Sequence, residues 1–365
     1  MKTTLLYPWH EAAGARFVSF AGYTMPVQYP RGAVEEHRLC RRSAGLFDTG
    51  HMGRILVSGR GSGEALSALV SARILDMKAG QARYSLLLNE DGGVMDDLFI
   101  YRLEEEAWLV VVNAGNRETD AVCFREQLAP CKVEDISDTV YMTAIQGPRA
   151  VEILDRLSGG AVSPMARSTM ISAPVAGINA RIGRTGYTGE DGAEIYHDAS
   201  RALELWEALL EGAEKAGIEI GPAGLAARDS LRFEAGMPLH GHEITPSITP
   251  AEALLSWACD FEKDFTGKAA ALAAKQNLKR KLVTLNVSGG VPREGYPVLN
   301  GEGNEIGRCA AGMFCPTTGT YSANALVPLQ YTPAGTKLRV LIRGNPKEAV
   351  VIKRPLYTPA YRSIK

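Results

Sequence analysis

A strand pattern with two acids inside it stands out between residues 89 and 101. Polar residues and two glycines form a turn signal at 89–93, and a β-prone apolar run follows. Because side chains alternate between the two faces of a strand, Asp96 lies on one face and Asp97 on the other. The companions of Asp96 are Val94, Leu98 and Ile100, and those of Asp97 are Met95, Phe99 and Tyr101.

Each of these carboxylates therefore has apolar neighbours. A buried carboxylate costs free energy unless it is paired, hydrogen-bonded or protonated, and chains keep such groups mainly where a site uses them. The alternative is structural: one Asp caps the turn and the other pairs with an arginine. The residues alone leave both interpretations open.

The rest of the pattern predicts α+β lobes followed by an all-β domain. Residues 82–88 form a strand that the turn joins to 94–101 as a hairpin. Further strands are predicted at 55–58, 108–113, 139–146, 169–175 and 178–183, and helices at 33–43, 61–70, 115–128, 147–159, 202–213 and 223–235. After a helical connector near 268–281, short strands are predicted at 281–287, 296–299, 305–311, 338–343 and 350–353. Residues 47–53 and 184–196 are predicted as loops.

Composition and charge narrow the function classes. The 365 residues suffice for two or three lobes, with the hydrophobic and charged content of a globular protein. A formal net charge of −1 gives no electrostatic case for nucleic acid or an anionic membrane. No apolar run approaches the roughly 20 residues that span a bilayer, and no signal peptide is expected. Six scattered cysteines without a Cys-x-x-Cys pair predict reduced thiols and a cytoplasmic location.

The helix predicted at 223–235 carries a cluster of charges, Arg228, Asp229, Arg232 and Glu234. Arg228 and Arg232 are four residues apart and share a face, so one of them could hold a carboxylate by two hydrogen bonds. The alternative is that the four charges pair with one another.

Histidines and glycines add weaker signals. His51 is the most suggestive loop histidine, although most such residues are structural. His240-Gly241-His242-Glu243 lacks the helical spacing of a zinc site and a third ligand, so no metal is expected. The glycines at 59, 61 and 63 lack dinucleotide-binding spacing.

Several motifs occur together and in order. They are Phe20-Ala21-Gly22, Met25-Pro26-Val27-Gln28-Tyr29, Gly92-Gly93-Val94-Met95-Asp96-Asp97-Leu98, Arg184-Thr185-Gly186-Tyr187-Thr188-Gly189-Glu190-Asp191-Gly192, the segment from Gly224 to Met237, and Arg293-Glu294-Gly295-Tyr296. With this combination, the chain resembles the glycine-cleavage T-protein family of tetrahydrofolate-dependent aminomethyltransferases. The resemblance implies a three-lobed cloverleaf with antiparallel sheets and a C-terminal β-barrel or jelly-roll domain around a folate channel.

Two regions are expected. Residues 1–275 form the folate-binding region as two interleaved α+β lobes, roughly 1–50 with 139–245 and 51–138 with 246–275. Residues 276–365 form the C-terminal barrel.

The resemblance also implies roles for individual residues. Asp96, the first Asp of the Gly-Gly-x-x-Asp-Asp motif, is expected to be catalytic beside a folate amine, with Asp97 as a structural partner. The expected folate contacts are Met52, Tyr84, Tyr187, Glu194, Arg228 and Tyr361. No metal is implied.

The implied reaction is a one-carbon transfer in glycine catabolism. The partner, lipoylated H-protein, carries an aminomethyl group whose methylene passes to the cosubstrate tetrahydrofolate with release of ammonia. Positioning of the reactants matters most, and a carboxylate beside the folate amine can take up a proton and stabilise the iminium character that develops.

Some positions depart from the family pattern and leave the donor open. They include Tyr23, Thr49, Gly50, Ala311 and Cys315. One alternative is a tetrahydrofolate-dependent methyltransferase or demethylase with a small methylated donor. Another is a non-catalytic folate-binding protein, against which Asp96 and Arg228 argue.

Overall fold

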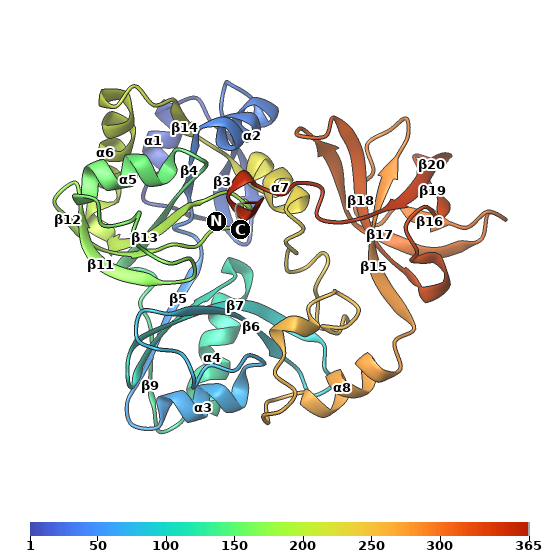
Figure 1. Ribbon diagram of the computed structural model, residues 1–365, viewed down its shortest axis with the longest axis horizontal. Helices are drawn as coiled ribbons and strands as arrows, with labels where there is room; N and C mark the ends of the chain where they lie inside the picture. Colours follow the sequence, from blue (N-terminus) through green and yellow to red (C-terminus); the bar gives the residue numbers. More distant parts are fainter. Residues whose placement is uncertain (364–365) are drawn as a thin grey trace.

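The computed structural model describes residues 1–363, and the protein consists of three bodies around a common centre (Figure 1). Two α+β bodies lie one above the other in this view, and a β-barrel lies beside them. The predicted α+β fold with a C-terminal barrel is confirmed. Residues 364 and 365, the last two of the expected barrel range, lie outside the described residues.

The upper body contains a six-stranded sheet with the order β11-β12-β13-β10-β4-β14. Its strands are β4 (Ala44–Asp48), β10 (Val140–Gln146), β11 (Met170–Val175), β12 (Ile178–Gly183), β13 (Gly192–Asp198) and β14 (Ile220–Pro222). Neighbours pair antiparallel, except that β14 runs parallel to β4. Helices α5 (Ala150–Ser158) and α6 (Ala202–Lys215) bury their apolar stripes in the core of this body.

N-terminal segments complete the upper body. A small sheet contains β1 (Lys2–Thr3), β3 (Tyr23–Gln28) and β2 (Arg16–Phe20). Helices α1 (Tyr7–Ala12) and α2 (Ala33–Arg42) flank it, as Figure 1 shows.

The lower body contains a five-stranded sheet with the order β6-β7-β8-β5-β9. Its strands are β5 (Gly53–Ser58), β6 (Ala82–Leu88), β7 (Val94–Glu104), β8 (Ala107–Val112) and β9 (Lys132–Asp135). Helices α3 (Ser62–Leu69) and α4 (Arg117–Gln127) cover one face of the sheet. Leu98 and Ile100 of β7 belong to the core beneath these helices, so the face of β7 that carries Asp96 points toward the helices.

The predicted hairpin of β6 and β7 is confirmed, with Leu87 opposite Asp96 and Leu86 opposite Asp97. The turn of this hairpin is fixed by hydrogen bonds within it and by a contact with Pro246. Asn89 accepts the Gly93 N–H at 2.8 Å and donates to the Pro246 carbonyl at 3.0 Å. A Cβ on Gly93 would stand 1.9 Å from that carbonyl oxygen, so only glycine fits there.

The third body is a closed barrel with the order β15-β18-β17-β16-β19-β20. Its strands are β15 (Arg280–Val287), β16 (Pro297–Leu299), β17 (Glu305–Cys315), β18 (Thr320–Pro328), β19 (Lys337–Ile342) and β20 (Asn345–Ile352). Helix α8 (Lys268–Gln276) leads into it, and α7 (Leu225–Glu234) contacts α2 and β3 on one side and β17 on the other.

Among the described residues, eight strands lie where none was predicted, namely β1, β2, β3, β4, β9, β13, β14 and β18. β18 is rich in Ala, Ser and Asn, which have weak β-propensity, and it is held by ladders to both β15 and β17. The prediction of a loop at 47–53 is wrong at residues 47, 48 and 53, which belong to β4 and β5, and β4 is short, fully buried and paired on both sides. The prediction of a loop at 184–196 is wrong at residues 192–196, which belong to β13.

After β20 the chain returns to the upper body and ends its described part in α9 (Ala360–Ser363). The backbone N–H groups of Leu356 and Tyr357 donate to the Glu234 carbonyl at the end of α7. Within residues 1–363, no helix has the length and apolar character needed to cross a membrane.

Candidate active site

A cavity of about 1130 Å³ lies between the two α+β bodies and the segments that enter and leave the barrel. β6 and β7 contribute from the lower sheet, and β13 with the loop before it from the upper sheet. Residues 235–238, 253–257 and the returning C-terminal segment complete the wall. The volume is that of a small-molecule site.

All six residues expected to contact folate line this cavity. They are Met52, Tyr84, Tyr187, Glu194, Arg228 and Tyr361. Asp97 also lines it, whereas Asp96 is not among the lining residues.

Asp97 is a half-buried acid with donors on both carboxyl oxygens. The Asn113 amide donates to Oδ1 at 2.7 Å, and the Tyr84 hydroxyl donates to Oδ2 at 3.1 Å. Burial and the nearby charge of Asp96 raise the pKa of Asp97 to about 7. Near neutral pH this carboxyl group can therefore either accept or release a proton.

Asp96 lies on the opposite face of β7, beneath α4, and is 0% exposed. It accepts hydrogen bonds from the Asn113 backbone at 2.9 Å, the Asn113 side chain at 2.8 Å and the Asn116 side chain at 2.7 Å. The expectation that Asp96 meets the ligand does not agree with this placement. The alternation separated the two acids correctly: Asp96 lies on the face of the sheet that α4 covers, and Asp97 lies on the face that lines the cavity.

Glu194 enters the cavity from β13 and is almost fully buried. The Thr185 hydroxyl donates to Oε2 at 2.6 Å, and the Tyr101 hydroxyl lies 3.4 Å from the same atom. Burial raises the pKa of Glu194, although Thr185 and Arg228 oppose that rise. Its Oε1 is not used in these contacts and remains available to accept from a ligand N–H.

Arg228 projects from α7 and forms no ion pair within the described part of the chain. Its guanidinium lies 4.8 Å from the centre of the Tyr187 ring, in a cation–π contact. Burial lowers the pKa of Arg228, while Tyr187 and Glu194 favour its charged form. The Tyr187 hydroxyl is fixed in turn by the Pro238 carbonyl. This cavity arginine can therefore bind an anionic or carbonyl group of a ligand.

Tyr361 reaches the cavity from the returning C-terminal segment. Its hydroxyl donates to the Gly189 carbonyl at 2.8 Å, and the Arg167 guanidinium lies 3.3 Å from its ring centre. A residue far along the sequence therefore closes the wall beside the glycine-rich loop.

Two cavity residues were missed by sequence reasoning. Asn113 joins the two acids, because its amide donates to both of them. Its position at the end of a predicted strand is the only signal that could have singled it out. Trp257 stacks on Tyr84 with ring centres 5.4 Å apart and is 70% exposed at the rim. It follows a segment without regular periodicity, so nothing in the pattern indicated it.

The sequence left two interpretations of the charged residues of α7 open, namely a ligand-binding arginine or pairing of the four charges with one another, and each interpretation holds for some of them. Arg232 pairs with Asp229 and with the buried Glu243 at 2.8 Å, which also accepts from Asn324 of the barrel. Glu234 pairs with His37 and Arg41. Only Arg228 is left to face the cavity. Glu243 is thus engaged in a buried ion pair that joins α7 to the barrel.

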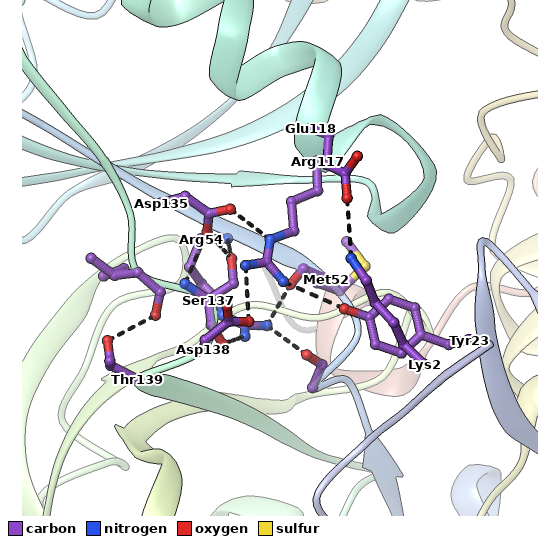
Figure 2. A network of polar contacts seen from close by, with 12 residues as sticks. Lys2, Tyr23, Met52, Arg54, Arg117, Glu118, Asp135, Ser137, Asp138 and Thr139 are labelled. Atoms are coloured by element: carbon purple, nitrogen blue, oxygen red, sulfur yellow. Dashed lines mark hydrogen bonds and ion pairs between the residues drawn. The ribbon is translucent and has the colours of Figure 1, made fainter.

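The positions that depart from the family pattern lie away from the cavity lining. Figure 2 shows Tyr23 beside Arg117, which also binds Asp135 and Asp138. Gly50 packs against Tyr141, whose ring a Cβ would approach to 2.3 Å. Thr49 is buried and donates to the Met142 carbonyl, and Ala311 and Cys315 pack in a small cluster with Phe233.

The fold and the site together define a class of protein. An internal cavity with one acid titrating near neutral pH, a second buried acid and an unpaired arginine is typical of an enzyme that performs acid–base chemistry on a bound organic molecule.

Comparison with known proteins identifies the family. The GCVT N-terminal domain matches residues 6–263, and the glycine cleavage T-protein C-terminal barrel domain matches residues 280–358. Aminomethyltransferases of Prosthecochloris aestuarii and Desulforamulus reducens are each 40% identical, covering 99% and 98% of this chain and 100% and 98% of their own lengths. The crystal structure of glycine cleavage system aminomethyltransferase T from Bartonella henselae has a TM-score of 0.92 and 37% identity, with 98% of each chain covered. This chain belongs to the glycine cleavage T-protein family, and it is an aminomethyltransferase.

Proposed function

We propose that the chain transfers a methylene group from the aminomethyl-lipoyl arm of H-protein to tetrahydrofolate, with release of ammonia. The observation that carries this proposal is the cavity itself. The six residues that the family resemblance predicts as folate contacts line one space, and an acid with a pKa of about 7 faces the same space.

We also propose a place for each group in folate binding. The Glu194 carboxylate accepts from the amino-pyrimidine edge of the pterin, whose N–H groups match an acceptor pair. Arg228 and Tyr187 bind polar and aromatic parts of the folate, and Tyr84 and Trp257 provide a stacking surface at the rim. Met52 packs against the bound molecule, and Tyr361 closes the wall.

Asp97, and not Asp96, is the proposed acid–base residue. In the transfer, the bond from carbon to ammonia and the bond from carbon to sulfur break, and two folate nitrogens bond to that carbon. The two protons leaving the folate nitrogens end on ammonia and on the sulfur. An Asp97 carboxylate beside a folate N–H can orient the amine, accept its proton and stabilise the cationic carbon–nitrogen unit.

The test mixes the protein with aminomethylated H-protein and tetrahydrofolate and measures ammonia and methylene-tetrahydrofolate. Asp97→Asn should lower kcat by about a hundredfold or more, the usual contribution of a positioned acid or base, with little change in folate affinity. Asp96→Asn should retain more turnover than Asp97→Asn and shift the pH profile of kcat toward lower pH, because the Asp96 charge raises the pKa of Asp97.

Two outcomes would contradict these assignments. An active Asp97→Asn with an inactive Asp96→Asn would return the acid–base role to Asp96. Folate binding by the unmodified protein without turnover would exclude H-protein as the donor, and assays with small methylated amines would then test the demethylase alternative.

A further inference from the structure

Asp120 on α4 is a buried acid that the proposed reaction does not use. It is 2% exposed and neighbours Asp96 on the side of β7 away from the cavity. Its Oδ2 atom is buried and has no N–H or O–H donor among the described residues. A carboxylate in this situation would be left without compensation for its lost hydration.

Asp96, Asp97 and Asp120 form a cluster of three carboxyl groups, of which Asp96 and Asp120 are buried and Asp97 is half-buried at the cavity. Within residues 1–363, no Lys or Arg forms an ion pair with any of the three, and the largest influences on Asp97 and Asp120 are burial, the neighbouring carboxyl groups and neutral donors. The other titratable groups nearby are Cys123 on α4 and His240, which the Asn116 amide joins to Asp96. Three such carboxylates cannot all be ionised at neutral pH, so at least one carries a proton.

The hydrogen bonds indicate which group holds that proton. Asp96 accepts three N–H donors, and Asp97 accepts from Asn113 and Tyr84. Asp120 lies beside Asp96, is 2% exposed and has no N–H or O–H donor for its Oδ2 among the described residues, so two carboxyl groups can lie next to each other here only if one of them carries a proton that the other accepts. In agreement, burial and the neighbouring Asp96 raise the pKa of Asp120 to about 10.

We propose that Asp120 is a positioning residue that stays protonated and donates its O–H to Asp96, and that Asp96 and Asn113 thereby hold Asp97 in place at the cavity. The Asn113 amide makes the connection, with one N–H on Asp96 at 2.8 Å and the other on Asp97 at 2.7 Å. This inference rests on the proposed function, in which Asp97 handles the proton of the folate amine.

A neutral Asp120 also limits the negative charge around Asp97. If Asp120 ionised, a second carboxylate behind Asp96 would raise the pKa of Asp97 further and keep it protonated at neutral pH. The protonated acid thus both supports Asp96 and leaves Asp97 free to titrate.

Three variants separate this role from simple packing. Asp120→Asn keeps a neutral N–H donor for Asp96, Asp120→Leu removes the donor, and Glu126→Gln removes an exposed acid from the same helix as a control. Asp120→Leu should lower kcat for ammonia release by about tenfold to a hundredfold, the effect of losing one hydrogen bond to a charged group. Folate affinity should change by no more than about twofold, because Asp120 does not touch the cavity. Asp120→Asn should rescue most of the kcat lost in Asp120→Leu.

A spectroscopic readout tests the proton independently of activity and of the stability of the leucine variant. At a pH between the pKa values of about 7 for Asp97 and about 10 for Asp120, infrared spectra should contain a protonated-carboxyl C=O band. This band should be absent from Asp120→Asn and present in Glu126→Gln.

Identical spectra for the unmodified protein and Asp120→Asn would overturn the inference, as would an unchanged kcat in a folded Asp120→Leu. Failure of the proposed function would give a different result. The unmodified protein itself would then release no ammonia, and the infrared spectra would be unaffected.

Discussion

The pH dependence of stability provides a direct measure of the buried proton on Asp120. An Asp in the unfolded chain has a pKa of about 3.9, whereas the folded protein raises the pKa of Asp120 to about 10. Between these values the folded state holds one proton that the unfolded state has released. Stability therefore falls as pH rises through this window, by about 1.4 kcal/mol for each pH unit. At pH 7 the accumulated cost is about 4 kcal/mol relative to strong acid.

The Asp120→Asn substitution removes this free-energy cost of protonation. It keeps the shape of the side chain and an N–H donor toward Asp96. The difference in unfolding free energy between Asp120→Asn and the unmodified protein should grow in favour of Asn by about 4 kcal/mol between pH 5 and pH 8. Urea unfolding followed by tryptophan fluorescence, to which the buried Trp108 of the same body contributes, can measure the difference. Glu126→Gln should show no such slope. A constant difference between Asp120→Asn and the unmodified protein across this range would refute the assignment of the proton to Asp120.

Three further predictions concern activity, binding and packing. kcat/KM for ammonia release should rise as pH increases through about 7, where the Asp97 carboxyl ionises, and Asp97→Asn should lack that limb. Arg228→Met should weaken folate binding by about tenfold to a hundredfold in calorimetric titrations, because a charged donor is lost from the cavity, and unchanged affinity would argue against a folate contact. Gly50→Ala should lower stability by about 1–3 kcal/mol in thermal unfolding, because its Cβ would stand 2.3 Å from the Tyr141 ring, whereas Gly301→Ala, with open space around it, should be close to neutral.

Local pattern predicted the elements whose stability depends on their own residues. The hairpin at 82–101 and the amphipathic helix α6 follow from turn chemistry and periodicity. β18 was missed because its Ala, Ser and Asn residues have little β-propensity of their own and depend on two neighbouring ladders. Strand formation there is decided by tertiary contacts.

The candidate site likewise has features that the local sequence predicted and features that only tertiary packing determined. Alternation separated Asp96 from Asp97, but which face meets the cavity depends on where α4 packs, and α4 lies beyond a further strand in the sequence. Trp257 could not be anticipated, because it stands beside Tyr84 only after the segment following α7 has crossed the lower body. Residue types and spacing therefore identified candidates, while packing determined their roles.

The closing contact of Tyr361 on Gly189 has a consequence for synthesis of the protein in the cell. Arg228 and Glu194 leave the ribosome well before the returning segment, with the whole barrel still to be made. At usual elongation rates, the roughly 130 residues between Arg228 and Tyr361 take on the order of ten seconds to translate. During that interval the half-built cavity exposes charged and aromatic surface to the surrounding solution, so tight folate binding should begin only after the barrel and the segment behind it have emerged.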